Sequence, residues 1–396
     1  MHGKNFRTTL LLSALVAFAP MSIDMYLPSL PALERYFAAD TASVQHTLAS
    51  FFVGLALGQL LYGPVADKYG RKPPLYFGLT LYVLASAACA LAPGINSLVG
   101  LRFLQAVGGC AGMVIARAMV RDIYDRQESA RVFSILLMVM GIAPIVAPLA
   151  GGYLLAWLGW RSIFWVLALF GVACMVAVKS RLPETIPQDQ PRIPLSKALG
   201  NYAGLLANRH YLGYALSGGF GQAGMFAYIS GSPFVFIDLY RVPAHYYGWL
   251  FGLNAAGIIA FTQANRRLLL HHDADRVFDS GNLAGFLMCL LLLAAAVSNI
   301  AGLIGILVPL FFVVSLRGLT FPNASAGAMA PFPEKAGSAS ALLGSVQFAI
   351  AALASAAVGL FHNGTAVPMA AVITVCGLLA FVSYRGLALE TWGKRR

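Results

Sequence analysis

The chain is a nearly continuous series of long apolar runs, separated by short breaks rich in charge, glycine or proline. Six runs in each half are long enough to cross a bilayer as a helix, which needs about 20 residues. The pattern therefore predicts an all-α integral membrane protein with twelve transmembrane helices. The predicted spans are 8–30, 46–66, 74–92, 97–118, 131–155, 161–179, 211–237, 245–265, 277–297, 300–322, 337–361 and 366–386.

A polar stretch divides the runs into two sets of six, which predicts an N-terminal bundle at 1–180, a linker at 181–209 and a C-terminal bundle at 210–396. Leu195, Ala198, Leu199, Tyr202, Leu205 and Leu206 fall on one helical face of the linker. We expect an amphipathic helix lying on the membrane surface, with a disordered connector as the alternative. A weak repeat between FVGLALGQLLYGPVAD and FGLNAAGIIAFTQAN, 198 residues apart, supports two related halves.

Composition excludes a water-soluble fold. Hydrophobic residues make up 59% of the chain and charged residues 11%, with a mean hydropathy of +0.74, whereas soluble proteins carry about 25% charged residues. Lys4 and Arg7 ahead of the first run imitate a secretory signal peptide, but the run continues beyond the signal-like part, and we expect it to stay as the first span.

The positive charges predict the orientation. Of the 27 lysines and arginines, 21 fall in breaks on one side of the predicted membrane, three on the other side and three within spans. Loops rich in these residues stay cytoplasmic, so both termini and the linker are predicted to be cytoplasmic. Because the charges are scattered and form no single patch, the net charge of +12 does not predict nucleic-acid binding.

Few residues suggest bound cofactors or enzyme chemistry. The five cysteines lie inside apolar runs without metal-ligand spacing, and His271 and His272 beside Asp273 and Asp275 are expected to form a solvated loop. The chain lacks a GxxxxGK[ST] motif, which argues against direct coupling to ATP, and no nucleophile-and-base set stands out. We predict no metal, no organic cofactor and no enzymatic activity.

The charged residues inside predicted spans include Asp24, Arg102, Arg117 and Arg317. Such residues are costly in a bilayer, by about 2.5–3.5 kcal/mol on insertion scales, and usually functional. Asp24 and Arg102 each lie about six residues, or roughly 9 Å, from the outer end of a helix, so we predict that they pair and that Asp24 binds a proton. The alternatives are a permanent structural ion pair and an Arg102 side chain that reaches the outer surface.

The break after the second span, GPVADKYGRKP, resembles the loop between the second and third helices of the major facilitator superfamily. In that family the loop is a conformational latch, which implies a structural role here, with Arg121 or Arg117 as a partner of Asp67. The alternative is an ordinary basic turn. The residues that carry the resemblance are Gly63, Asp67, Gly70, Arg71 and Lys72.

Three further motifs resemble the same superfamily. The fourth span, LVGLRFLQAVGGCAG, is similar to its proton-coupling element, and the first, SIDMYLPSLPAL, to the bicyclomycin-resistance (Bcr/CflA) group. The fifth, MGIAPIVAPLAGGYL, resembles the motif of the antiporter branch, although Ala147 replaces the glycine before its second proline; generic helix kinking is the alternative. Its motif residues are Gly141, Pro144, Pro148, Gly151 and Gly152.

The resemblance implies a proton-driven multidrug efflux antiporter of the bacterial cytoplasmic membrane, working by alternating access as a monomer on small lipophilic drugs. Asp24 and Arg102 would couple the proton. Methionines and aromatics on inner faces would contact substrate, or else pack and face lipid: Tyr26, Met113, Met138, Met140, Met225, Phe226, Tyr228 and Phe234. The alternatives are an exporter of one metabolite (a sugar, amino acid or siderophore), a non-transporting receptor or scaffold, and a membrane enzyme.

Overall fold

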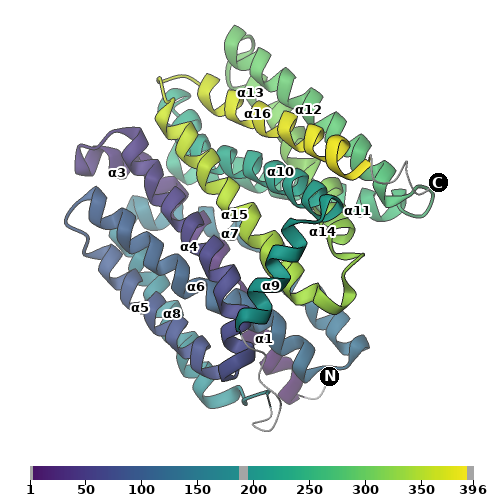
Figure 1. The fold of residues 1–396 in the computed structure, drawn as a ribbon. Coiled ribbons are helices and arrows are strands. Elements are labelled where there is room, and N and C mark those ends of the chain that lie inside the picture. Colours follow the sequence, from purple (N-terminus) through teal and green to yellow (C-terminus); the bar gives the residue numbers. More distant parts are fainter. Residues whose placement is uncertain (1–2, 187–194, 390–396) are drawn as a thin grey trace.

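The computed structural model describes residues 3–186 and 195–389, which are almost entirely helical (Figure 1). The elements before the linker are α1 (Gly3–Val16), α2 (Phe18–Asp24), η1 (Leu27–Ser29), α3 (Leu30–Phe37), α4 (Thr41–Tyr69), α5 (Lys72–Ala90), α6 (Ile95–Ile123), α7 (Arg126–Leu158) and α8 (Trp160–Arg181). Those after it are α9 (Leu195–Leu206), α10 (Arg209–Pro233), η2 (Phe234–Leu239), α11 (Ala244–Leu268), α12 (Ala274–Ser298), α13 (Gly302–Ser315), α14 (Arg317–Met329), η3 (Pro333–Lys335), α15 (Ala336–Leu360), α16 (Val367–Ser383) and η4 (Tyr384–Leu389).

The helices agree with the predicted twelve spans. Within the described residues, nine helices are long and apolar enough to cross a membrane, and the bent pair at the N-terminus makes a tenth. The other two spans are α10 and α11, each of 25 residues, whose glycines and polar side chains lower their hydropathy. Most of α10 is buried among other helices, so it does not need an apolar surface toward lipid.

Two predicted spans are broken rather than continuous. The first bends by 43° between α1 and α2 and breaks again after Asp24, in a segment that contains Pro20, Pro28 and Pro31. The tenth is split into α13 and α14 between Ser315 and Arg317. Hydropathy averaged over a window could not locate these breaks, because the average stays high across a broken span.

The two halves pack against each other crosswise. α4, the second span of the first half, lies against α15, the fifth of the second half (Figure 1). In the same way α7, the fifth span of the first half, lies against α11, the second of the second half. In both pairs the second span of one half packs on the fifth span of the other, which is the pseudo-symmetry that the weak sequence repeat suggested. We call the side that carries α9 and both ends of the described chain the linker side, and the opposite side, where α3 ends, the far side.

The linker helix α9 contacts both halves, packing on α4, α10 and α15. Ala198, Tyr202 and Leu205 are buried, and the Tyr202 hydroxyl donates to the Leu60 carbonyl of α4 over 3.1 Å. Leu199 and Leu206, from the same predicted apolar face, are 59% and 46% exposed. Part of this face therefore packs on protein and part stays on the surface of the molecule.

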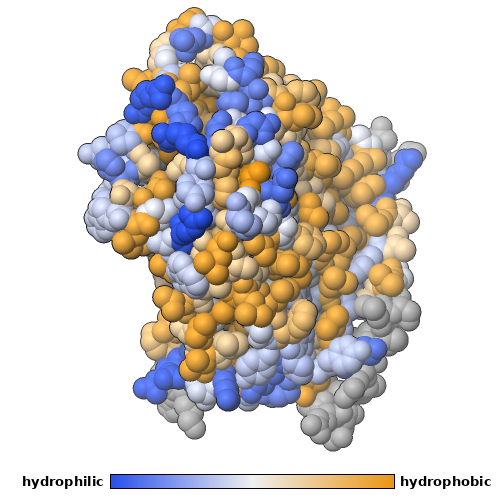
Figure 2. All heavy atoms as spheres, turned by 90° about the vertical axis from the view of Figure 1, so that its left-hand side faces the viewer, coloured by the Kyte–Doolittle hydropathy of each residue, from blue (hydrophilic) through white to orange (hydrophobic). Residues whose placement is uncertain are grey.

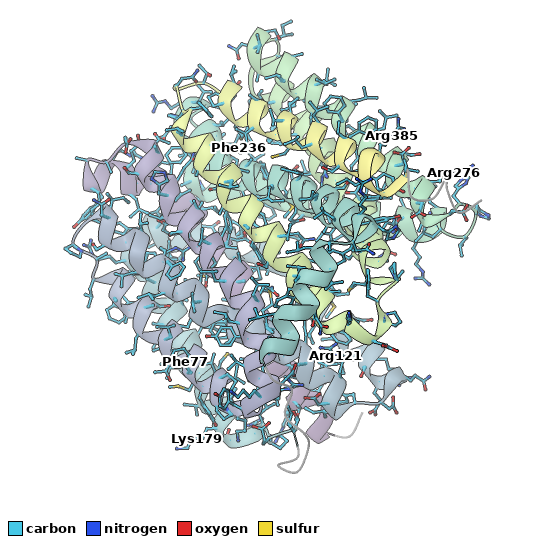
Figure 3. All side chains as sticks on the ribbon, viewed as in Figure 1. Phe77, Arg121, Lys179, Phe236, Arg276 and Arg385 are labelled. Carbon is cyan, nitrogen blue, oxygen red and sulfur yellow. The ribbon has the colours of Figure 1, made fainter. Side chains whose placement is uncertain are left out.

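The outer surface has the polarity of a membrane protein. In Figure 2, apolar residues cover the middle of the molecule and hydrophilic residues gather toward its top and bottom. Large apolar side chains such as Phe77 and Leu169 are 64% and 68% exposed, and Figure 3 shows Phe77 at the outside of the helices. Such a surface is stable against lipid tails and would aggregate in water.

Candidate functional site

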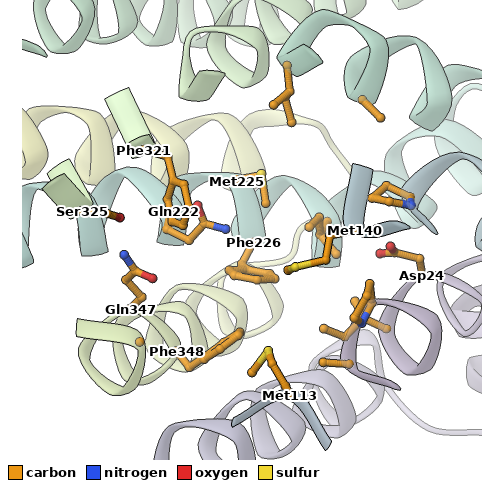
Figure 4. Close-up of a pocket in the computed structure, with 18 of the residues that line it drawn as sticks. Asp24, Met113, Met140, Gln222, Met225, Phe226, Phe321, Ser325, Gln347 and Phe348 are labelled. Atoms are coloured by element: carbon orange, nitrogen blue, oxygen red, sulfur yellow. The ribbon is translucent and has the colours of Figure 1, made fainter. Parts of the chain in front are cut away.

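A cavity of about 450 Å³ lies between the two halves (Figure 4). Its lining runs from the middle of the helices, at Asp24 and Tyr228, to positions near their linker-side ends, at Arg117 and Met329. No described residue from the far-side ends lines it. The cavity therefore extends from the centre of the molecule toward the linker side.

Asp24 is the last residue of α2, where the first span breaks, and its carboxylate faces the cavity (Figure 4). It is 4% exposed, and it is the single acidic side chain among the described residues that line the cavity. Across the cavity, the Tyr228 hydroxyl accepts a hydrogen bond from Asn254. In the described part of the chain no cation forms an ion pair with Asp24, so its carboxyl group is available to a proton or a ligand.

The predicted pairing of Asp24 with Arg102 is wrong for this structure. Arg102 is fully buried inside the first half, where its guanidinium donates to Gln105 and, over 3.0 Å, to the Ser22 carbonyl. The guanidinium carbon lies 4.4 Å from the centre of the Tyr26 ring and 4.2 Å from that of Phe51. These rings supply the cation–π contacts that a buried arginine needs. The alternative in which Arg102 reaches the outer surface is also excluded.

Five of the eight predicted substrate-contact residues line the cavity: Met113, Met140, Met225, Phe226 and Tyr228. The other three do not. Tyr26 is buried beside Arg102, with its hydroxyl 2.8 Å from that of Thr47. Met138 is 57% exposed on the outside of α7, and Phe234 lies toward the far side, near His362.

Polar residues of the cavity were missed by the substrate prediction. Four are amides: Gln59, Gln222, Asn254 and Gln347. Arg117, the single basic residue among the described lining residues, was expected near Asp67 instead. The sequence could have identified these residues, because a polar side chain inside a transmembrane helix usually faces protein or a cavity rather than lipid.

The latch residues come together on the linker side, but with other partners than those predicted. Arg71, between α4 and α5, forms ion pairs with Asp67 and, over 2.8 Å, with Asp122 at the end of α6. Neither Arg121 nor Arg117 forms an ion pair with Asp67 in the described structure. Gly70, with φ at +92°, makes the turn that positions Arg71.

Glu184, which follows α8, completes this cluster. Its carboxylate accepts hydrogen bonds from the backbone N–H groups of Arg71 and Lys72, at 2.8 and 2.9 Å, and caps the start of α5. Partial burial acts to raise the pKa of Glu184, but these and the neighbouring backbone hydrogen bonds outweigh it and hold the pKa below its usual 4.5. Gly63 has open space around its α-carbon.

The glycines of the predicted antiporter motif hold α7 against both halves. A β-carbon at Gly151 would lie 2.0 Å from the Met25 carbonyl oxygen, and one at Gly152 would lie 2.9 Å from the Ala244 oxygen at the start of α11. Gly141 is looser, at 3.8 Å from an Ile259 side-chain carbon. Pro144 lines the cavity, and Pro148 lies within the same helix.

Comparison with known proteins agrees with this architecture. Residues 12–356 match the family described as Major Facilitator Superfamily. An uncharacterised MFS-type transporter of Bacillus subtilis, YdgK, is 37% identical, with 97% of this chain and 96% of that protein covered. The bicyclomycin resistance protein homolog of Haemophilus influenzae is 31% identical, with 95% and 94% covered, and multidrug resistance protein D of Escherichia coli 27% identical, with 97% and 96% covered.

Solved structures show the same fold. The crystal structure of a D-xylose–proton symporter matches with a TM-score of 0.74 at 14% identity, covering 97% of this chain and 98% of that one. The solved structure confirms the predicted fold class, and the family match with the named relatives confirms the resemblance to the bicyclomycin-resistance group and the prediction of a transporter rather than an enzyme. The chain belongs to the Major Facilitator Superfamily and is a multi-pass membrane transporter whose relatives include bicyclomycin-resistance and multidrug-resistance proteins.

Proposed function

We propose that this transporter exports small drug-like compounds in exchange for protons, and that Asp24 is the group that carries the proton. One observation carries the proposal: among the described residues, the cavity lining has a single carboxyl group, and no cation forms an ion pair with it. Proton coupling in a membrane requires a titratable group that the transported compound can also reach. Its relatives named for resistance to bicyclomycin and to multiple drugs support the substrate class.

The mechanism is competition for one site. A protonated Asp24 is neutral and holds a positively charged or donor group of the substrate weakly, whereas the ionised carboxylate holds it strongly. Proton binding from outside would therefore favour release, and substrate binding from the cytoplasm would favour loss of the proton. The energy comes from the proton motive force, so the proposal needs no metal and no organic cofactor.

Alternating access requires the far side to open. In this structure it is closed where Gly151 packs on Met25, where Gly152 packs on Ala244 and where a β-carbon at Gly359 would lie 3.1 Å from Ala42. These contacts join the crosswise helix pairs, which can separate on the far side while they close on the linker side. In this proposal the transporter lies in the bacterial cytoplasmic membrane with its linker side toward the cytoplasm, because loops rich in lysine and arginine stay on that side.

Arg102 has an indirect part in this mechanism. It does not touch the cavity, but it donates to the Ser22 carbonyl, two residues before Asp24. We therefore assign it as a positioning residue, which holds the end of α2 so that Asp24 faces the cavity. The proton itself is carried by Asp24 alone.

Inverted membrane vesicles test the proposal. The variant Asp24→Asn should abolish the drug-induced change in ΔpH, because an amide cannot carry a proton, while drug binding to the purified protein remains measurable. Glu334→Gln, which removes an exposed acid on the linker side, is the matched control and should behave as the wild type. Undiminished proton-driven transport by Asp24→Asn would disprove the role of Asp24.

Export of one natural metabolite on the same fold is the second candidate. The four amides of the cavity favour it, because fixed donors and acceptors suit one polar compound better than many lipophilic ones. Growth of an efflux-deficient bacterium that expresses this chain separates the two functions. Resistance to several unrelated drugs supports multidrug export, and resistance to none of a broad panel excludes it.

A further inference from the structure

We infer that the part of the cavity nearest the linker side is a subsite for a carboxylate, so that the compounds this transporter favours are zwitterions rather than simple lipophilic cations. The inference rests on the proposed function in one respect, because it takes the cavity to be the place where the exported compound binds. It goes further by naming the charge pattern of that compound.

The first observation is a cation without an anionic partner. Arg117 lies near the linker-side end of α6, lines the cavity and is partly buried. Its guanidinium approaches the Met140 sulfur at 3.8 Å, and among the described residues no carboxylate forms an ion pair with it. The acids of the latch cluster, Asp67 and Asp122, are both paired with Arg71. A desolvated arginine without a counter-ion favours an anion supplied by a ligand.

The second observation comes from the other half of the protein. Gln347 of α15 is 7% exposed and lines the cavity, and its amide nitrogen has no hydrogen-bond partner in the described structure. Figure 4 shows Gln347 and Gln222 directed into the space between Phe321 and Phe348. A buried N–H donor without an acceptor is costly, so this group also favours a ligand oxygen.

Together these groups give the cavity a dipolar pattern. Arg117 is the single described cation of the lining and lies toward the linker side, whereas Asp24 is the single described acid and lies at the inner end. A compound with a carboxylate at one end and an amine at the other would satisfy both, with its rings against Phe226 and Phe348. A lipophilic cation would satisfy Asp24 but would have to pass the like charge of Arg117.

Two probes that differ by one group test this pattern on the purified full-length protein. Norfloxacin carries a carboxylate and a protonated amine, and its methyl ester keeps the amine and loses the carboxylate. Binding is measured by the intrinsic fluorescence anisotropy of each probe. The wild type should bind the acid more tightly than the ester. In Arg117→Gln the acid should lose about 10- to 100-fold in affinity, the usual worth of a hydrogen bond to a charged group, while the ester changes by less than about threefold.

Further variants separate a specific effect from loss of folding. Arg117→Lys keeps the charge and should retain part of the preference for the acid. Gln347→Glu, which replaces an unpartnered donor of the cavity lining by a negative charge, should weaken binding of the acid more than that of the ester. Arg131→Gln removes an exposed arginine outside the cavity lining and should match the wild type. Three outcomes would overturn the inference. Arg117→Gln could lose affinity equally for both probes, the wild type could bind both with equal affinity, or the wild type could bind neither.

This binding assay and the vesicle ΔpH assay together distinguish the inference from the proposed function. Selective, Arg117-dependent binding of the acid with no drug-induced ΔpH response would support the subsite and refute proton-driven export. A ΔpH response with indifferent binding of acid and ester would support the export and refute the subsite.

Discussion

The glycines of the predicted latch and antiporter motifs provide a graded test of the packing. A β-carbon would meet nothing within 4 Å at Gly63, a side chain at 3.8 Å at Gly141, a carbonyl oxygen at 2.9 Å at Gly152 and another at 2.0 Å at Gly151. Since ordinary contact begins at 3.4 Å, alanine at Gly151 must push α7 and the Met25 backbone apart by about 1.4 Å. The obstacle is backbone, so no side-chain rotation can relieve it.

The expected energies follow from this geometry. Alanine gains about 1 kcal/mol of helix propensity over glycine at each site. At Gly63 nothing opposes this gain, and Gly63→Ala should be neutral or slightly stabilising. At Gly151 overpacking costs about 1–3 kcal/mol and displaces the residue next to Asp24. Gly151→Ala should therefore be less stable than Gly63→Ala, and should lose transport as well.

Apparent melting temperatures of the purified variants, together with the drug-induced ΔpH response in vesicles, measure both effects. The four alanine variants should rank Gly63, Gly141, Gly152 and Gly151 from most to least stable. If Gly151→Ala melts as high as Gly63→Ala and transports normally, the close contact between α7 and Met25 is not part of the working structure.

Three further predictions concern residues outside the cavity. Arg102→Lys keeps the charge but loses the planar fork that reaches Ser22, so drug-induced proton movement should fall at least tenfold; wild-type transport would show that charge alone suffices. Glu184 has a lowered pKa, so its contribution to stability is present above pH 4.5 and is lost as the pH falls through the lowered value; Glu184→Gln should melt lower at pH 7 with a flatter acid dependence, and an unchanged pH–melting curve would contradict this. Tyr202→Phe removes the hydrogen bond from α9 to Leu60 and should cost about 1 kcal/mol of stability, seen as a lower melting temperature that Leu199→Ala, at an exposed position, does not share.

Sequence reasoning located the proton-binding candidate but not its neighbours. Asp24 could be identified because an acid inside an apolar run is rare and costly. The predicted pairing with Arg102 rested on the equal depth of the two residues in the membrane, and equal depth does not make two side chains face each other. The rotation of each helix about its axis decides which side chains meet, and hydropathy does not give that rotation. Arg102 therefore faces Tyr26 and Phe51, and Asp24 faces the cavity.

The same limit explains the mixed result for substrate contacts. Met138 and Met140 were both predicted, but they are two positions apart, and residues two apart on a helix point about 200° away from each other. Only one of them can face the cavity, and it is Met140. The amides and Arg117 were missed because the prediction sought apolar and aromatic contacts, although polar residues inside spans carry the stronger signal.

The sequence by itself determined that this chain crosses a membrane, how many spans it has, and which charged residues lie inside those spans. Those properties follow from composition and periodicity, which are local. The tertiary structure decided which faces meet: α7 on Met25 and on α11, Arg71 between Asp67 and Asp122, and Arg117 rather than Arg102 at the cavity. Such contacts join segments far apart in sequence, and they depend on helix breaks and on close approach at small residues, which no hydropathy pattern encodes.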